Sequence, residues 1–169
     1  MAEEIPTLGT ERLVLRPMRA GDWPAYGAFM ASERARYMGG PFDTEGAWGI
    51  FCSDHAQWSL FGVGSLMIEE RATGAVLGSV GINSGPLFPE WELGWMVYPG
   101  AEGLGIAFEA AAALRDWARD RRGLETLVSY VDAENTRSRR LADRLGAVLD
   151  PAAPRNDPAD LVYRHFRRA

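Results

Sequence analysis

The sequence contains no lysine; all 18 of its basic residues are arginines. A P-loop lysine, a Schiff-base lysine and a lysine general base are therefore excluded. With 23 acidic residues, the chain has a net charge of −5 and a pI of about 5.1. Charges of both signs are spread along the chain without forming a basic stripe, so a nucleic-acid partner is not expected. An anionic ligand would have to be held by local features.

Cysteine and long apolar stretches are also scarce. Cys52 is the one cysteine, which excludes an internal disulfide. No apolar run approaches the roughly 18 residues of a membrane span, and the opening MAEEIPTLG shows no signal-peptide pattern. We therefore expect a cytoplasmic protein with no membrane partner. Its 169 residues, 47% of them hydrophobic, are enough for one well-buried core and predict a single domain over residues 1–169.

The hydrophobic pattern changes between strand-like and helix-like segments. Strands are predicted at 11–18, 64–71, 75–83, 90–97, 126–131 and 160–168. Helices are predicted from the N-cap Asp22, over 44–58, from the glycine loop to about Gly123, and over about 135–145. The apolar stripe of the third helix would comprise Ala107, Ala110, Ala111, Leu114, Trp117 and Ala118. This order predicts an α/β or α+β fold around a mixed sheet.

A glycine-rich loop precedes the third predicted helix. It reads YPGAEGLGIAFEA at 98–110 and places Gly103 and Gly105 just before the helix. A dinucleotide fingerprint is not satisfied, because its third small position is occupied by Phe108. Backbone N–H groups at a helix start, where the helix dipole is positive, can nevertheless hold a pyrophosphate without a lysine. A simple turn is the alternative interpretation.

Four motifs in this order resemble the GNAT superfamily of acyl-CoA N-acetyltransferases, in particular its branch similar to ribosomal-protein N-terminal acetyltransferases. They are TERLVLRPMRAGDWPAY at 10–26, ATGAVLGSVGI at 72–82, EGLGIAFEA at 102–110, and N-x-x-S at Asn135 and Ser138 followed by LGA at 145–147. The resemblance covers nearly the whole chain. It implies a central twisted sheet, mixed but mostly antiparallel, of about six to seven strands flanked by about four helices. It also implies acetyl transfer from acetyl-CoA to a primary amine, on a peptide N-terminus or a small molecule.

The resemblance further implies a coenzyme site between the fourth predicted strand and the following helix. The pantetheine arm would pair with the strand end, where a backbone N–H near Val97 would face the thioester oxygen. The residues implied to bind the coenzyme are Trp95, Met96, Val97, Gly103, Leu104, Gly105, Ile106, Ala107, Asn135 and Arg140. Arg137 and Arg139 are further candidates for phosphate charge, with a solvated helix face as the alternative. No metal is expected.

Glu92 is the candidate general base. It lies between Trp91 and Trp95, and apolar neighbours raise the pKa of a carboxyl group toward the useful range. Glu92 would take a proton from the acceptor ammonium, directly or through water. Glu90 is the nearby alternative, and a solvent-exposed glutamate at a strand edge is the competing interpretation of Glu92.

The proton donor to the leaving thiolate is less evident. In the superfamily a tyrosine seven residues after the helix asparagine frequently serves, and that position is Ala142 here. The resemblance then points to Ser138 or to water. Asn135 and Ser138 also suit the N-cap and N3 positions of a helix, so simple capping is the alternative role for both.

Two residues depart from the family pattern. Gly100 stands where the loop often has Arg or Gln, and Glu102 stands where a basic residue is common. Both changes remove positive charge near the phosphates. Together with Ala142 they favour, as an alternative function, a catalytically silent acyl-CoA-binding or regulatory module. An unrelated nucleotide-binding α/β protein is a third hypothesis, and both a monomer and a homodimer are compatible with the sequence.

Two histidines carry no expected chemistry. His55 stands at helical i, i+3 spacing from Cys52, but no third partner for a cysteine hydrolase is present nearby. His165 lies in the last predicted strand and is interpreted as a sheet residue.

Overall fold

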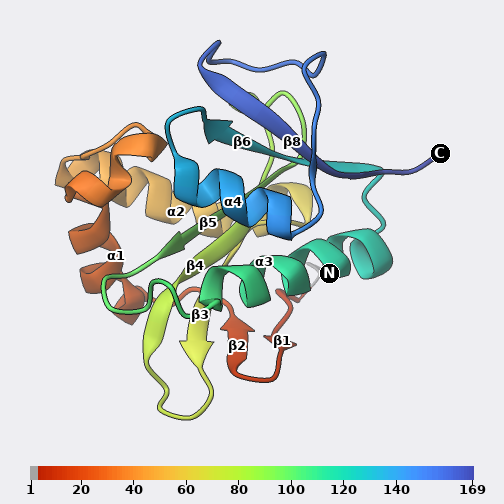
Figure 1. Cartoon of the computed structure of the whole chain (residues 1–169). Coiled ribbons are helices and arrows are strands. Elements are labelled where there is room, and N and C mark those ends of the chain that lie inside the picture. The colour runs from red at the N-terminus through yellow and green to blue at the C-terminus, as the bar shows by residue number, and fades with distance from the viewer. Residues whose placement is uncertain (1–3) are drawn as a thin grey trace.

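The strands form one eight-stranded sheet with helices on both faces (Figure 1). The computed structural model describes residues 4–169, so residues 1–3, at the start of the stretch without a signal-peptide pattern, lie outside it. The strands are β1 (Leu8–Gly9), β2 (Leu13–Arg16), β3 (Ser65–Glu70), β4 (Val76–Asn83), β5 (Glu92–Val97), β6 (Thr126–Asp132), β7 (Val148–Leu149) and β8 (Asp160–Arg167). Their order is β1-β2-β3-β4-β5-β6-β8-β7, and of the described strand pairs only β5 and β6 are parallel.

Within residues 4–169, four α-helices accompany the sheet, as expected. They are α1 (Trp23–Met30), α2 (Thr44–Phe61), α3 (Ile106–Trp117) and α4 (Thr136–Arg144), with short helical segments η1 (Ala20–Asp22), η2 (Glu33–Met38) and η3 (Ala118–Arg122). The predicted mixed, mostly antiparallel fold is confirmed, but the sheet has eight strands rather than six or seven. No sequence pattern predicts β1, because a two-residue strand is too short to show an alternation of apolar and polar residues.

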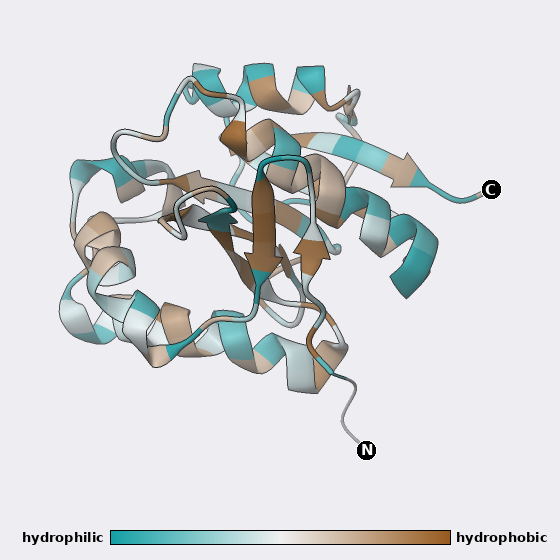
Figure 2. Ribbon diagram, turned by 90° about the horizontal axis from the view of Figure 1, so that it is seen from below, coloured by the Kyte–Doolittle hydropathy of each residue, from teal (hydrophilic) through white to brown (hydrophobic). Residues whose placement is uncertain are grey.

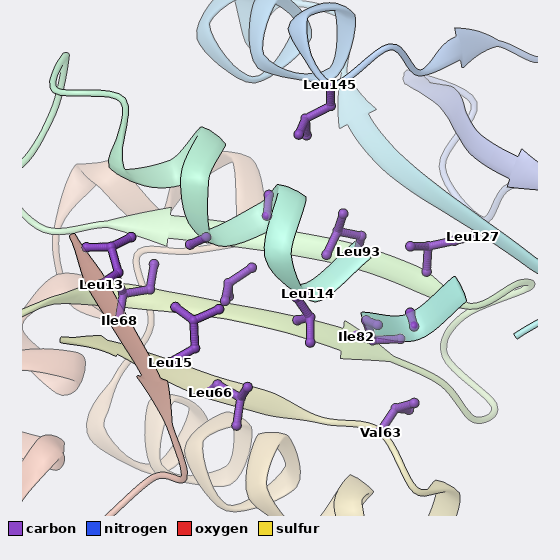
Figure 3. Packing of buried hydrophobic residues seen from close by; sticks show 14 of the residues in the cluster. Leu13, Leu15, Val63, Leu66, Ile68, Ile82, Leu93, Leu114, Leu127 and Leu145 are labelled. Atoms are coloured by element: carbon purple, nitrogen blue, oxygen red, sulfur yellow. The ribbon is translucent and has the colours of Figure 1, made fainter. Parts of the chain in front are cut away.

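The two faces of the sheet carry separate hydrophobic clusters. The larger cluster lies under α3, where Leu114 packs over the strands that carry Leu15, Ile68 and Ile82 (Figure 3). The other cluster lies between the sheet and α1 and α2 and includes Tyr26 and Met96. Figure 2 shows that the central strands are largely hydrophobic, whereas the helices mix hydrophilic and hydrophobic residues. Because successive side chains of a strand point to opposite faces, they pack alternately toward α3 and toward α1 and α2.

One helix prediction needs correction, and another is confirmed with a different bonding pattern. Ile106 is buried in the first turn of α3, whereas Ala107, predicted to lie on the apolar stripe, is only half-buried. The apolar stripe therefore begins one residue earlier. Asp22 does occupy the N-cap of α1 but makes no side-chain capping bond there. Its carboxylate instead accepts two hydrogen bonds from the buried guanidinium of Arg16, at 2.9 and 2.8 Å, and one from the backbone N–H of Arg19, at 2.7 Å.

Among residues 4–169, no helix combines the length and the apolar character that crossing a membrane requires. The same described residues contain no group of three or more His, Cys, Asp or Glu side chains that could hold a metal ion.

Candidate active site

A groove of about 970 Å³ runs along the end of β5. Its walls come from four parts of the chain that are distant in sequence: η2, the end of β5 with the following glycine loop, the first turn of α3, and α4. Figure 1 shows that the arrowhead of β5 leads into the loop before α3, with α4 nearby. The geometry of β5 explains why the groove is there.

Strand β5 is fully paired on one edge only. Six Cα pairs join it to β4, from Gly78↔Val97 to Asn83↔Glu92. On the other edge the parallel pairing with β6 is limited to Glu92↔Val128, and the two arrowheads point apart (Figure 1). The later residues of β5 therefore present an edge without a partner strand, and this edge lies in the groove.

Two side chains occupy the point where β5 and β6 diverge. The buried hydroxyl of Ser129, on β6, donates to the carbonyl oxygen of Leu93 at 2.5 Å and lies 2.8 Å from Nε2 of His165. Because the serine proton is used on Leu93, Nε2 of His165 must be the donor to Ser129. Burial, with the nearby Arg115, lowers the pKa of His165 to about 4, so the ring is neutral. The Ser129–His165 pair replaces the missing backbone pairing and is not an accessible nucleophile.

The unpaired edge of β5 exposes specific backbone groups. The N–H of Tyr98 bonds to the carbonyl of Leu77 on the β4 side, whereas the carbonyl of Trp91 accepts from β6. Since edge preference alternates along a strand, the N–H and C=O groups of Trp95 and Val97 point to the open edge. Within residues 4–169 they have no strand partner. This is the arrangement that an extended ligand arm would need.

The glycine loop meets the groove with its backbone. Gly103 and Gly105 have φ values of +71° and +76°, and a Cβ built on Gly103 would meet no atom within 4 Å. Gly105 is the N-cap of α3 and makes no side-chain capping bond, and the backbone N–H of Glu109 is the first to reach back, to Gly105. For the described part of the chain, the N–H groups of residues 106–108 thus lack an intrahelical acceptor. They form a potential anion site.

Arg12, a residue that sequence reasoning missed, holds this loop in place. Its Nη1 donates to the carbonyl of Leu104 at 2.9 Å, and its Nε donates to Glu109 at the same distance. Thr10 also donates to Glu109, at 2.5 Å. Arg12 and Glu109 are 97 positions apart in sequence, so no local signal could have revealed the contact.

The start of α4 forms the opposite wall. Asn135 is the N-cap, and its Oδ1 accepts from the backbone N–H of Ser138 at 3.2 Å. The hydroxyl of Ser138 in turn accepts from Nε1 of Trp95 at 3.2 Å. Because that bond uses a lone pair, the hydroxyl proton of Ser138 is free to be donated into the groove. Capping and groove lining therefore coexist at these two residues.

The arginines of α4 have different roles. Arg140 lines the groove, and Arg144 stacks over the ring of Phe108 with 4.7 Å from its guanidinium carbon to the ring centroid. Arg139 instead donates to the carbonyl of Ala133 at 3.0 Å and is not among the groove residues.

Glu102 spans the mouth of the groove. It forms ion pairs with Arg34 of η2 and with Arg137 of α4, the latter at 2.8 Å. The sequence indicated only that Glu102 subtracts charge from the phosphate site, but the structure shows its charge matched by two arginines. η2 also brings Arg36 and Tyr37 to the groove. This segment was not predicted, because its six residues have no clear helical periodicity.

Glu92 is buried rather than solvent-exposed, with 8% of its surface accessible. Its Oε2 accepts from Nδ2 of Asn83 at 2.7 Å. Burial raises the pKa of Glu92 to about 7, helped by the negative charges of Asp54 and Asp160, while the bond from Asn83 acts in the opposite direction. The shift is in the predicted direction, but the two tryptophans expected to cause it do not surround Glu92. Trp91 and Trp95 pack on the cluster under α3, on the opposite face from Glu92.

Other candidates occupy different surroundings from those expected. Glu90 is engaged by Arg164 through both oxygens, at 2.9 and 3.0 Å, and is not a free base. Leu104 is 57% exposed and does not line the groove, and its carbonyl accepts from Arg12. Ala142, which stands where the family often has a tyrosine, is fully buried in one cluster with Tyr163 and has no hydroxyl to donate.

Cys52 and His55 are both exposed on α2, and no hydrogen bond joins them within the described residues.

Most of the residues predicted to bind the coenzyme line the groove. Those that line it are Trp95, Met96, Val97, Gly103, Gly105, Ile106, Ala107, Asn135 and Arg140, together with Ser138. Their roles stay predictions, but their common location is a structural fact. Glu92 lies behind this wall, three positions before Trp95 on the same strand.

Comparisons with known proteins agree with this geometry. A family profile described as acetyltransferase (GNAT) domain matches residues 12–148. An acetyltransferase from Agrobacterium tumefaciens str. C58 has 56% sequence identity and a TM-score of 0.95, covering 99% of this chain and 98% of its own.

Two more distant structures share the fold. The ribosomal L7/L12 alpha-N-protein acetyltransferase RimL, in complex with coenzyme A, has 16% identity and a TM-score of 0.75, covering 94% of this chain and 96% of its own. Spermidine N-acetyltransferase from Vibrio cholerae, in complex with coenzyme A and spermine, has 16% identity and a TM-score of 0.72, covering 92% and 94%. With the family match over most of its length, the chain belongs to the GNAT family and is an N-acetyltransferase.

Proposed function

We propose that this protein transfers the acetyl group of acetyl-CoA to a primary amine by direct attack. The open edge of β5 beside the uncapped start of α3 is the observation that carries the proposal. It offers backbone groups to an extended pantetheine arm and N–H donors to a pyrophosphate within one groove. The relatives support the ligand class, since RimL and the spermidine N-acetyltransferase were both obtained with coenzyme A.

The proposed reaction assigns each group one task. The amine nitrogen attacks the thioester carbonyl carbon, the new C–N bond forms and the C–S bond breaks. The N–H of Val97, on the open edge of β5, would stabilise the oxyanion. Glu92 would take the ammonium proton directly or through one water, since a carboxyl group with a pKa of about 7 is ionised often enough and basic enough near neutral pH. Ser138, or water, would return a proton to the thiolate.

The acceptor is proposed only as a class. A protein N-terminus and a small polyamine are both amines, and of the two distant relatives one is an alpha-N-protein acetyltransferase and the other a spermidine N-acetyltransferase. Residues of η2, among them Arg36 and Tyr37, line the groove on the side of α1. We propose that this segment contacts the acceptor.

A turnover assay separates this proposal from a silent binding module. Thiol release from acetyl-CoA is followed in the presence of a panel of amines: N-terminal peptides, polyamines and amino acids. Amine-dependent release is expected for at least one class. Binding of coenzyme A without release for any amine would instead favour the silent module, and binding of NAD or ATP in place of coenzyme A would contradict both.

A further inference from the structure

A buried chain of side-chain amides lies directly behind Glu92. Gln57 of α2 is 6% exposed, and its Nε2 donates to Oδ1 of Asn83 at 3.1 Å. Asn83, at the end of β4, then donates through Nδ2 to Oε2 of Glu92 at 2.7 Å. The Cα pairing Asn83↔Glu92 places the two side chains next to each other on one face of the sheet.

The direction of this chain is set by the backbone. The N–H of Ser84 can only donate, and it donates to Oε1 of Gln57 at 2.6 Å. The other end of the Gln57 amide must therefore be the donor, and its acceptor must be the oxygen of Asn83. Asn83 consequently turns its NH2 group to Glu92. The N–H of Ser84 thus fixes the orientation of the Gln57 amide, and Gln57 fixes that of Asn83. The NH2 group of Asn83 is therefore directed at the Glu92 carboxylate.

A glycine leaves room for that carboxylate. Gly94 lies two residues further along β5 on the same face, and a Cβ built there would stand 3.2 and 3.4 Å from the two carboxylate oxygens of Glu92. The Glu92 side chain therefore leans along the strand, over Gly94 on the same face. The residue paired with Gly94 on β4 is Gly81, which also has no side chain.

We propose that Asn83, held by Gln57, is the positioning residue that aims the Glu92 carboxylate at the acceptor amine, and that Gly94 keeps its path open. This inference rests on the proposed function of Glu92 as base. A donor from Asn83 stabilises the ionised carboxylate, whereas burial favours the protonated form. The amide chain therefore keeps a deeply buried glutamate available as a base near neutral pH.

Other groups that face Glu92 must be separated from this effect. Asp54 approaches from α2, Asp160 from β8 and Tyr130 from β6. Burial raises the pKa of Asp54 to about 6, while the hydroxyl of Tyr26 donates to it at 2.8 Å. Asp54→Asn removes a neighbouring negative charge and should move the acid limb of activity to lower pH. Loss of Asn83 should move it to higher pH, so the two variants differ in sign.

The test is the pH profile of kcat/KM with an amine that the parent enzyme acetylates. In Asn83→Ala the acid limb should move up by about one pH unit, because a hydrogen bond to an ionised group is lost. Activity should be about tenfold lower on the acid limb and recover at high pH, with unchanged coenzyme A affinity. Asn156→Ala is the matched control, since Asn156 donates to Leu87 on an exposed loop. A purely structural role would lower activity at every pH and leave the limb in place.

Gly94→Ala provides an independent variant on another strand. Its Cβ would displace the Glu92 carboxylate, so kcat should fall several-fold while coenzyme A affinity is retained. An acid limb at the parent pH in folded Asn83→Ala, or parent kcat in Gly94→Ala, overturns the positioning role. Glu92→Gln, assayed in parallel, separates the two proposals. If Glu92→Gln keeps the acid limb, Glu92 is not the base. If Glu92→Gln loses the limb while Asn83→Ala and Gly94→Ala behave like the parent, only the positioning inference fails.

Discussion

Strand β5 meets its two neighbours in different ways. Six Cα pairs tie it to β4, whereas one pair, Glu92↔Val128, ties it to β6. On the paired edge, the hydrogen-bonded register of β4 and β5 places Asn83 directly beside Glu92. The open edge leaves the backbone of Trp95 and Val97 free for a ligand. One strand thus supports the buried Glu92, the proposed base, on one edge and leaves the other edge without a partner strand, and each edge can be perturbed separately.

The largest effect is expected at the paired edge. Glu92→Gln should lower kcat by about a hundredfold or more, because general-base assistance is commonly worth that much. Coenzyme A affinity should be unchanged, since Glu92 lies behind the groove wall. In the parent, kcat/KM should fall as pH drops below about 7, where the carboxylate becomes protonated. A loss well under tenfold with the same pH profile would remove Glu92 from the mechanism.

The open edge is tested through the loop that follows it. Gly103→Val should weaken coenzyme A binding by about tenfold or more, because the side chain would stand where the phosphates approach the backbone. Gly74→Val is the matched control: Gly74 has a φ of +74°, also faces open space, and lies in the β3–β4 turn. Calorimetric titration of both variants separates lost contact from backbone strain. Equal losses in the two would place the phosphates elsewhere.

Ser129→Ala tests the contacts at the point where β5 and β6 diverge. The substitution leaves the Leu93 carbonyl and Nε2 of His165 without their partner in a buried site. We expect a loss of about 1–3 kcal/mol in the free energy of unfolding, the usual cost of an unsatisfied buried polar group. Urea denaturation measures it. Ser84→Ala is a suitable control, because its structural contact is made by the backbone. A Ser129 variant as stable as the parent would mean that the divergence does not depend on this pair.

The smallest effect is expected at the groove mouth. Glu102→Gln releases Arg34 and Arg137, both of which line the groove, from their ion pairs. Coenzyme A affinity should rise about two- to fivefold at low ionic strength and return toward the parent value in high salt, because the gain is electrostatic and screened. Arg119, paired with Asp120 on an exposed surface, allows Asp120→Asn as the control. A weaker affinity in Glu102→Gln would show that the bridge is needed to shape the site.

Local patterns predicted most of the residues that line the groove. Gly103 and Gly105 before an amphipathic helix predict an anion-binding helix start, and the resemblance to the family added Asn135 and Ser138. These features depend on residues close together in sequence, where turn chemistry and helix capping are decided. The same reasoning failed for Glu92: Trp91 and Trp95 adjoin it in sequence, but alternation along the strand sends them to the opposite face.

The sequence by itself determined the order of the main strands and helices, the mixed sheet and the glycine loop, since these follow from periodicity and turn residues. Only the tertiary structure decided what surrounds the site. The bonds from Arg12 to Glu109, from Asn83 to Glu92 and from Ser129 to Leu93 join different elements. Such contacts depend on strand register and on where two strands diverge. Register is settled by the packing of both sheet faces at once, and no single stretch of sequence contains that information.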